Sequence, residues 1–274
     1  MPTFQRDDLA LHYAERGPRD APPVVLMHGL LFSYRLMERV AQRLPKYRVL
    51  LLDLHGHGKS DKPTDPARYT WSEMVADVDG LLDHLGLDGA VIGGLSLGAN
   101  VTLAYAQARP ERCDALILEM PVLLRGHRFG RPVFSTLAGV YTGGRLALRP
   151  LARTVNRLPL PRSLPELAAF RDMAGQDPAV AAAVLRGLLG DEPLAEDAET
   201  LARLTMPALV VGHRNDPLHV LDDARDLADR LPGGRFIEAP SIAHYRLRPG
   251  ELARQFSAFL DDVTSAPEDT RRRP

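Results

Sequence analysis

The chain has 274 residues, of which 45% are hydrophobic and 25% are charged. Apolar content of this size supports a globular domain with a large core and excludes a disordered chain. Because 34 Lys and Arg residues are balanced by 35 Asp and Glu residues, we expect no nucleic acid partner, since neutralising phosphates requires excess positive charge. The single cysteine, Cys113, excludes an internal disulfide and a cysteine zinc cluster.

Hydropathy along the chain bears on its location. The amino end, residues 1–8, is polar and lacks the apolar stretch of a signal peptide. No run of about 18 apolar residues occurs, so no transmembrane segment is expected. These patterns predict a soluble, cytoplasmic protein and leave its oligomeric state open.

Short apolar runs alternate with amphipathic segments along the chain. Residues 3–13 alternate in character and predict an antiparallel hairpin at a sheet edge. Continuous apolar runs predict strands buried on both faces, at residues 24–27, 49–52, 90–92, 115–118, 208–211 and 235–237. Helices are expected at residues 70–84, 97–108, 218–231 and 249–263. This rhythm predicts an α/β fold, with a mostly parallel central sheet flanked by helices.

One long interval contains no strand pattern. Residues 121–205 are rich in Ala, Leu, Arg and Pro and predict several short helices. A connection of this length indicates an inserted helical cap rather than a loop. The core domain is then expected at residues 1–120 and 206–264, and the polar residues 265–274 are expected to form a disordered tail.

The most specific motif is Gly94-Leu95-Ser96-Leu97-Gly98. It follows a predicted strand and precedes a predicted helix, which is the context of a nucleophile elbow, where a strained turn exposes the serine hydroxyl. The alternative is a serine that only caps the helix. We predict that Ser96 is a catalytic nucleophile. An oxyanion formed by its attack needs two backbone donors, and the N–H groups of Leu97 and Leu30 are the expected pair.

A serine hydroxyl is a weak nucleophile unless a base accepts its proton. His244 follows the predicted strand at 235–237, so we expect a loop at the sheet edge to hold it over Ser96 as that base. His219 is the other histidine that follows Asp216 in the sequence. We expect it at a helix start, too near the acid to act as a separate base.

The third member of such a site is a buried carboxylate that orients the histidine. Asp216 follows the predicted strand at 208–211 and is the expected acid. The alternative for Asp216 is a turn residue before Pro217, a common position for aspartate. Glu119, at the end of the predicted strand at 115–118, is the rival acid.

Together these residues resemble the α/β-hydrolase superfamily, in its capped, esterase-like branch. The order Ser, Asp, His matches the order in that family, and the resemblance covers nearly the whole chain outside the cap. In the family an Arg is more usual than His55, and a Gly is more usual than Ala243. The matching segments are His28-Gly29, Asp53 to Pro63, the elbow, Gly212 to Pro217, and His244.

The resemblance implies a serine hydrolase that cleaves a carboxylic ester through an acyl-enzyme, with no cofactor and no metal. Ser96 argues against haloalkane dehalogenases and epoxide hydrolases, which in this superfamily use an aspartate nucleophile. Carbon–carbon bond hydrolases, perhydrolases and acyltransferases use the same triad and stay open as alternatives. A small-molecule receptor of this fold with little turnover is a further alternative.

Arginine is concentrated in the predicted cap. Eight arginines and no Asp or Glu lie between Pro121 and Pro165. The simplest interpretation is a solvated basic face over a leucine core. The alternatives are a site for anionic substrate groups, a contact with an anionic lipid surface, or a docking surface for a protein partner. The expected ligand is a small-molecule ester with an apolar part, and an anionic group on it is left open.

Overall fold

The computed structural model describes residues 2–160, 165–192, 194 and 196–265. Within these residues the strands form one sheet of eight, in the order β1-β2-β4-β3-β5-β6-β7-β8. β1 and β2 form an antiparallel pair at one edge, β2 is antiparallel to β4, and the other neighbours are parallel. The strands are β1 Thr3–Arg6, β2 Leu9–Arg16, β3 Pro23–Met27, β4 Arg48–Leu52, β5 Ala90–Leu95, β6 Cys113–Glu119, β7 Ala208–His213 and β8 Gly234–Ala239.

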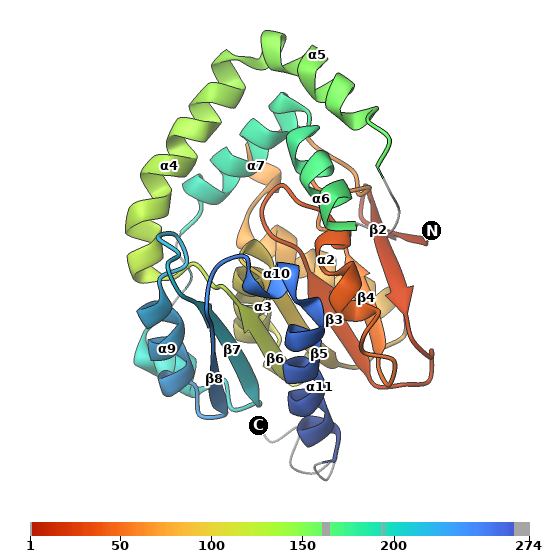
Figure 1. Cartoon of the computed structure of the whole chain (residues 1–274), viewed down its shortest axis with the longest axis vertical. Helices are drawn as coiled ribbons and strands as arrows, with labels where there is room; N and C mark the ends of the chain where they lie inside the picture. The colour runs from red at the N-terminus through yellow and green to blue at the C-terminus, as the bar shows by residue number, and fades with distance from the viewer. Residues whose placement is uncertain (1, 161–164, 193, 195, 266–274) are drawn as a thin grey trace.

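Helices cover both faces of the sheet (Figure 1). Alternate residues of β3 show the two layers. Val25 and Met27 pack with the helices at residues 71–84 and 97–108, whereas Val24 and Leu26 pack with the helices at residues 38–41 and 249–265. The strands are therefore apolar on both sides, as a parallel sheet requires. The helices of the core are α1 Glu38–Ala41, α2 Trp71–His84, α3 Leu97–Ala108, α9 Leu221–Arg230, α10 His244–Leu247 and α11 Pro249–Ser265, with the short 3-10 turns η1 Tyr34–Leu36, η2 Pro66–Arg68 and η3 Pro110–Arg112.

Helices alone fill the described part of the connection between β6 and β7. Figure 1 shows α4 and α5 as an arch above the sheet, with α6 and α7 between this arch and the core. The predicted α/β fold, its mostly parallel sheet and its inserted helices are thus confirmed, while the exact domain limits stay a prediction. The inserted helices are α4 Leu124–Gly143, α5 Arg145–Asn156, α6 Pro165–Ala174, α7 Pro178–Gly190 and α8 Ala198–Ala202.

Two element boundaries differ from the predicted ones or limit what is described. The helix expected at 218–231 begins only at Leu221, so the residues before it form a loop. The expected disordered tail lies outside the described residues, apart from Ser265, which ends α11. Among the described helices, none has the length and apolar character needed to cross a lipid bilayer.

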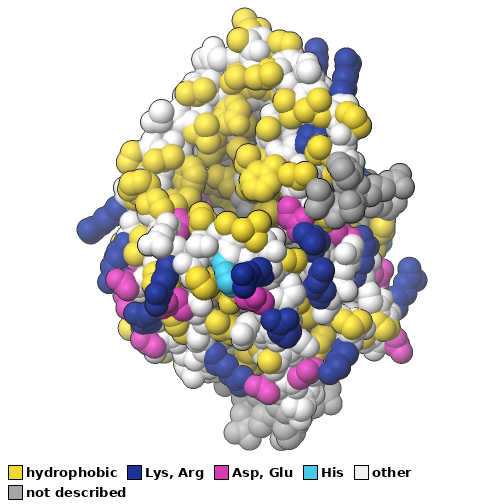
Figure 2. Space-filling model, in the orientation of Figure 1, with side chains coloured by type: hydrophobic (Ala, Val, Ile, Leu, Met, Phe, Trp, Pro, Cys, Tyr) yellow, Lys and Arg dark blue, Asp and Glu magenta, His cyan; other side chains and the backbone are white. Residues whose placement is uncertain are grey.

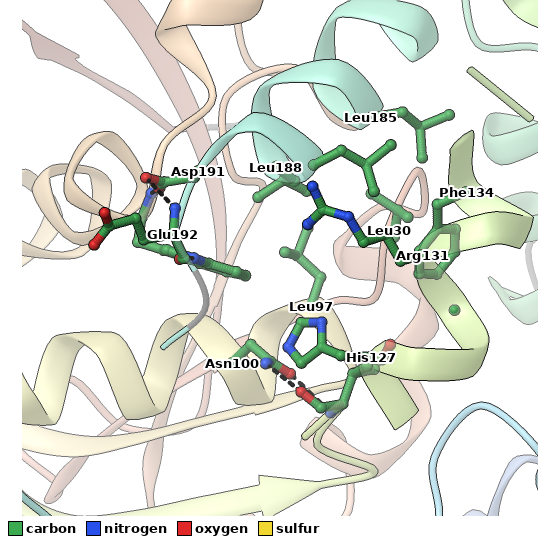
Figure 3. A pocket seen from close by; sticks show the side chains of 15 residues that line it. Leu30, Leu97, Asn100, His127, Arg131, Phe134, Leu185, Leu188, Asp191 and Glu192 are labelled. Carbon is green, nitrogen blue, oxygen red and sulfur yellow. Dashed lines mark hydrogen bonds between the residues drawn. The ribbon is translucent and has the colours of Figure 1, made fainter. Parts of the chain in front are cut away.

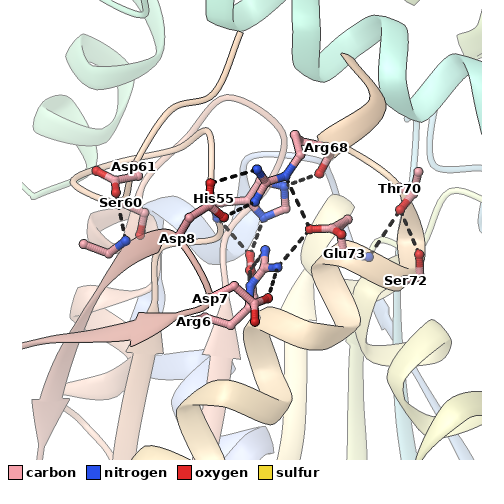
Figure 4. A network of polar contacts seen from close by, with 12 residues as sticks. Arg6, Asp7, Asp8, His55, Ser60, Asp61, Arg68, Thr70, Ser72 and Glu73 are labelled. Atoms are coloured by element: carbon pink, nitrogen blue, oxygen red, sulfur yellow. Dashed lines mark hydrogen bonds and ion pairs between the residues drawn. The ribbon is translucent and has the colours of Figure 1, made fainter. Parts of the chain in front are cut away.

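A polar network holds the loop after β4 (Figure 4). The two ring nitrogens of His55 lie 2.6 Å from Asp77 Oδ2 and 2.7 Å from the carbonyl oxygen of Arg68. Arg6 donates to Asp77 and to Glu73, at 2.9 Å in each case. Since His55 and Asp77 are fully buried, these hydrogen bonds satisfy groups that would otherwise destabilise the fold. His55 therefore has a structural role, at a position where the family that the sequence resembles more often has Arg.

Candidate active site

Ser96 occupies a strained turn between β5 and α3. Its backbone angles are φ 54° and ψ −112°, a conformation that is sparsely populated and typical of functional positions. The two flanking glycines allow strand and helix to approach: a Cβ on Gly94 would lie 2.4 Å from the carbonyl carbon of Gly98, and one on Gly98 would lie 2.6 Å from the carbonyl oxygen of Met27. The local geometry is that of a nucleophile elbow.

The side chain next to the Ser96 hydroxyl is His219. Its Nε2 lies 2.9 Å from Ser96 Oγ, and its Nδ1 lies 2.6 Å from Asp216 Oδ2. The other carboxylate oxygen of Asp216 accepts hydrogen bonds from the N–H groups of Leu218 and His219, at 3.0 and 3.1 Å. Serine, histidine and aspartate therefore form one continuous chain of hydrogen bonds, which reaches from the elbow to the loop after β7.

The charge on Asp216 supports this arrangement. Burial raises the pKa of Asp216, but the hydrogen bond and charge of His219, together with the two backbone N–H donors, outweigh burial and lower the pKa below its ordinary value. An ionised Asp216 holds the proton of His219 on Nδ1. The Nε2 atom is then free to accept the proton of Ser96.

The structure corrects the expected position of His244. This residue begins α10, and its Nε2 lies 2.8 Å from Glu251 Oε2 on α11. Residues 240–243 form a loop after β8, but Ala243 already has right-handed helical angles, φ −90° and ψ −9°, so His244 belongs to a helix. The prediction that His244 lies over Ser96 is therefore wrong for this structure, and the sequence reasoning passed over the histidine that does contact the serine.

The sequence argument against His219 as the base is that it lies only three residues after Asp216. In the structure this closeness brings the two side chains together, because α9 begins after His219 and leaves it in a turn. Asn215, with a φ of 60°, reverses the chain just before Asp216. The sequence does contain a pattern that indicates this contact. An aspartate side chain often accepts hydrogen bonds from the N–H groups of the turn that follows it. Such a turn places the side chain three residues later over the same carboxylate.

Glu119, the rival acid, is engaged elsewhere. Its two carboxylate oxygens lie 2.5 and 2.7 Å from Nη2 of Arg246, and its Oε1 lies 3.3 Å from Nε2 of His213. Burial raises the pKa of Glu119, but the positive charge of Arg246 and the neighbouring His213 outweigh burial and lower it. This ion pair ties α10 to the end of β6 and holds the segment that carries His244.

The expected oxyanion donors lie beside the elbow. Leu97 is the first residue of α3, so its N–H has no acceptor within the helix. Leu30 follows β3, and both leucines line the cavity above Ser96 (Figure 3). The next residue, Leu31, has a φ of 62°, which is unusual for a leucine and indicates a constrained loop.

The cavity over Ser96 lies between the core and the cap. Phe134 of α4 and Leu185 and Leu188 of α7 supply apolar walls. Figure 3 shows Arg131 reaching from α4 over Leu97 toward Leu188. Within the described residues Arg131 has no ion pair, in contrast to other cap arginines such as Arg125, Arg149 and Arg171.

Asp191 and His127 also line the cavity. Asp191 accepts a hydrogen bond from the N–H of Trp71 at 2.6 Å. Burial and the nearby Arg131 lower the pKa of His127, so its ring is neutral near neutral pH. In the described ranges, no group of three or more His, Cys, Asp and Glu side chains is placed to hold a metal ion.

Comparison with known proteins identifies the family. A family model described as "alpha/beta hydrolase fold" matches residues 22–246. The chain is 31% identical over 245 residues to a haloalkane dehalogenase of Mycobacterium marinum, an alignment that covers 82% of this chain and 78% of the relative. The chain therefore belongs to the α/β-hydrolase family.

Other curated relatives match a shorter part. Epoxide hydrolase 4 of Mus musculus is 33% identical over 111 residues, which is 40% of this chain and 31% of the relative. The chain spans about two fifths of the length of the first curated relatives it matches. These alignments support the family and do not specify the reaction of this chain.

Solved structures agree on the fold. An enol-lactonase from Burkholderia xenovorans superposes with a TM-score of 0.75 at 24% identity. The superposition covers 95% of this chain and 100% of the lactonase chain. A thermophilic esterase from Thermogutta terrifontis superposes with a TM-score of 0.75 at 23% identity, covering 96% of this chain and 98% of the other. At these identities the likeness concerns the fold alone.

Proposed function

We propose that this protein is a serine hydrolase that cleaves a carboxylic ester with Ser96, His219 and Asp216. The observation that carries the proposal is the hydrogen-bonded chain from Ser96 Oγ to His219, at 2.9 Å, and from His219 to Asp216, at 2.6 Å. A nucleophile, a base within hydrogen-bond reach and a group that orients the base are the components that acyl transfer requires.

The reaction would proceed in two balanced steps. Ser96 Oγ attacks the ester carbonyl carbon while His219 Nε2 takes the hydroxyl proton, and the carbon–oxygen bond to the alcohol then breaks as His219 returns that proton to the leaving oxygen. Water next attacks the acyl-enzyme and passes a proton through His219 to Ser96, which releases the carboxylic acid. Asp216 stabilises the imidazolium in both steps and is not itself protonated.

Charge develops on the carbonyl oxygen during both attacks. The N–H groups of Leu97 and Leu30 are the proposed donors to this oxyanion, in keeping with their places beside the elbow. Loss of one such donor typically costs about 10² to 10³ in rate. Both are backbone groups, so side-chain substitution at Leu30 tests the shape of the loop rather than the donor.

The identity of the nucleophile argues against the chemistry of the dehalogenase and epoxide hydrolase relatives. A carboxylate that displaces a halide or opens an epoxide forms an alkyl ester, which water can hydrolyse at the carbonyl carbon. Ser96 would instead form an alkyl ether, which has no carbonyl group for water to attack and would stop the enzyme after one turnover. Ser96 therefore favours acyl transfer over alkyl transfer.

The cavity favours an ester with an apolar part. Leu30, Phe134, Leu185 and Leu188 present hydrocarbon to the space above Ser96, and burial of apolar groups against such walls stabilises binding by about 25 cal/mol for each Å² removed from water. We expect short to medium acyl chains to be preferred.

The test is hydrolysis of p-nitrophenyl esters from acetate to decanoate by wild type and by S96A. Wild type is expected to turn over with an optimum in chain length, and S96A is expected to lose about 10⁴-fold or more in kcat. Equal rates for the two proteins would contradict the proposal. If neither hydrolyses any ester, a fluorophosphonate probe decides: labelling of wild type but not of S96A indicates an active nucleophile with another acyl substrate, and no labelling contradicts the role of Ser96.

A further inference from the structure

Two helices of the cap expose apolar side chains. On α4, Phe129, Val133 and Val140 are 52%, 50% and 52% exposed, and on α5 Leu146 is 81% exposed. Scattered single residues of this kind are common on protein surfaces, but a group of them on one side of adjoining elements marks an interaction site. We call these four side chains the apolar cap patch.

The apolar cap patch is separate from the active-site cavity. With 3.6 residues per turn, Phe129, Val133 and Val140 lie along one side of α4. Gly130 and Phe134, which line the cavity, lie on a different side of the same helix. Figure 2 shows hydrophobic side chains gathered over α4 and α5 around a hollow in the cap, with Lys and Arg side chains toward the rim.

The charged side chains of the two helices have one sign, although Arg125 and Arg149 are paired with carboxylates of other elements. The helices α4 and α5 contain no Asp or Glu, and in the described part of the chain the exposed Arg128, Arg145 and Arg153 form no ion pair with a carboxylate. Arg145, Arg149 and Arg153 recur every four residues and so lie along one side of α5. The cap thus combines exposed hydrocarbon with uncompensated positive charge.

We propose that α4 and α5 dock onto the surface of an anionic phospholipid bilayer. Phe, Val and Leu side chains can enter the boundary of the acyl region while guanidinium groups contact the headgroup phosphates, the combination by which amphipathic surface helices bind lipid. A second copy of the chain fits this face poorly, because pairing two caps would bring arginines together without acidic partners. The docking is peripheral and independent of the proposed hydrolysis.

Vesicle sedimentation tests the proposal, with the full-length S96A protein so that no lipid is consumed. We expect binding to vesicles of phosphatidylcholine mixed with phosphatidylglycerol, little binding to phosphatidylcholine alone, and weaker binding as salt rises toward about 0.15 M. The double variant R145Q/R153Q in the S96A background is expected to lower the partition coefficient about 25-fold, since each arginine contributes about fivefold.

A matched control removes two arginines outside the cap. Arg43 follows α1, and Arg254 lies on α11; both side chains are exposed, so R43Q/R254Q changes the net charge equally and should leave binding unchanged. Leu146→Ser is expected to weaken binding without changing the charge.

Three results would overturn the proposal. One is no sedimentation with anionic vesicles at low salt. Another is equal losses for the cap variant and the control variant. The third is a dimer in sedimentation velocity that Leu146→Ser dissociates, with no vesicle binding, which would make a second copy the occupant of the patch. None of these results depends on ester hydrolysis, so the two proposals fail separately.

Discussion

His219 Nε2 lies 2.9 Å from Ser96 Oγ, although 123 residues separate the two in sequence and a different histidine follows the last strand. The contact exists because the turn after β7 places the imidazole over the elbow while Asp216 holds its other nitrogen. His244 is held by Glu251 instead. The arrangement makes a direct prediction about which histidine serves as base.

His219→Gln is expected to lower kcat/KM for p-nitrophenyl butyrate by at least about 10³-fold, because it removes the base while Ser96 stays in place. His244→Gln should change it only a few-fold, since its ring bonds Glu251. Steady-state kinetics of both variants, with circular dichroism to verify folding, decide the matter. A large loss in His244→Gln with activity kept in His219→Gln would restore the assignment suggested by sequence order.

Arg131 should influence which esters are accepted, because it reaches over the cavity without an ion pair in the described residues. Arg131→Met is expected to lower kcat/KM for the p-nitrophenyl monoester of succinic acid by about 10- to 100-fold, the range of a charged hydrogen bond, and to leave the butyrate ester nearly unchanged. Arg128→Met, on the same helix but outside this cavity, is the control. Equal effects on both esters would show that Arg131 does not select charge.

The pair between Glu119 and Arg246 should support the fold near neutral pH. Arg246→Met leaves the fully buried Glu119 with only His213 nearby and is expected to cost about 3–5 kcal/mol in the free energy of unfolding. Because the folded pKa of Glu119 lies below its ordinary 4.5, this stabilisation is present above that pH and is lost as pH falls through the lowered pKa.

Urea unfolding at about pH 7 and about pH 4 measures this effect, and the difference between variant and wild type should narrow at the lower pH. Lys46→Met, which breaks the exposed pair with Asp261 at 3.3 Å, should cost less than about 1 kcal/mol. A pH-independent loss in Arg246→Met would indicate that packing of the arginine, rather than its charge, is responsible.

We expect that substituting a glycine of the elbow removes activity and destabilises the fold, whereas substituting a glycine of the cap does neither. A Cβ on Gly98 would meet the backbone oxygen of Met27 at 2.6 Å, but one on Gly139 of α4 meets nothing within 4 Å. Gly98→Ala is therefore expected to abolish activity and lower the thermal midpoint. Gly139→Ala should stabilise the helix by about 0.5–1 kcal/mol. Equal thermal midpoints for the two variants would refute the close strand–helix packing.

Local patterns were sufficient for the fold and for part of the site. Apolar runs of strand length marked the parallel strands of the sheet, and Gly94 to Gly98 identified the elbow, because a strand, a tight turn and a helix each leave a short-range signature. Asp216 was found for the same reason, since it follows a strand that ends at the same sheet edge.

The choice of histidine was beyond such patterns. Both His219 and His244 follow strands whose ends face Ser96, and each is near enough along the chain to reach it. Which ring points to the serine depends on backbone angles at Asn215 and Ala243 and on the distant partner Glu251. The sequence alone thus determined the proposed nucleophile and the proposed acid. The proposed base is selected by how two loops pack, because hydrogen-bond partners far apart in sequence meet only in the folded chain.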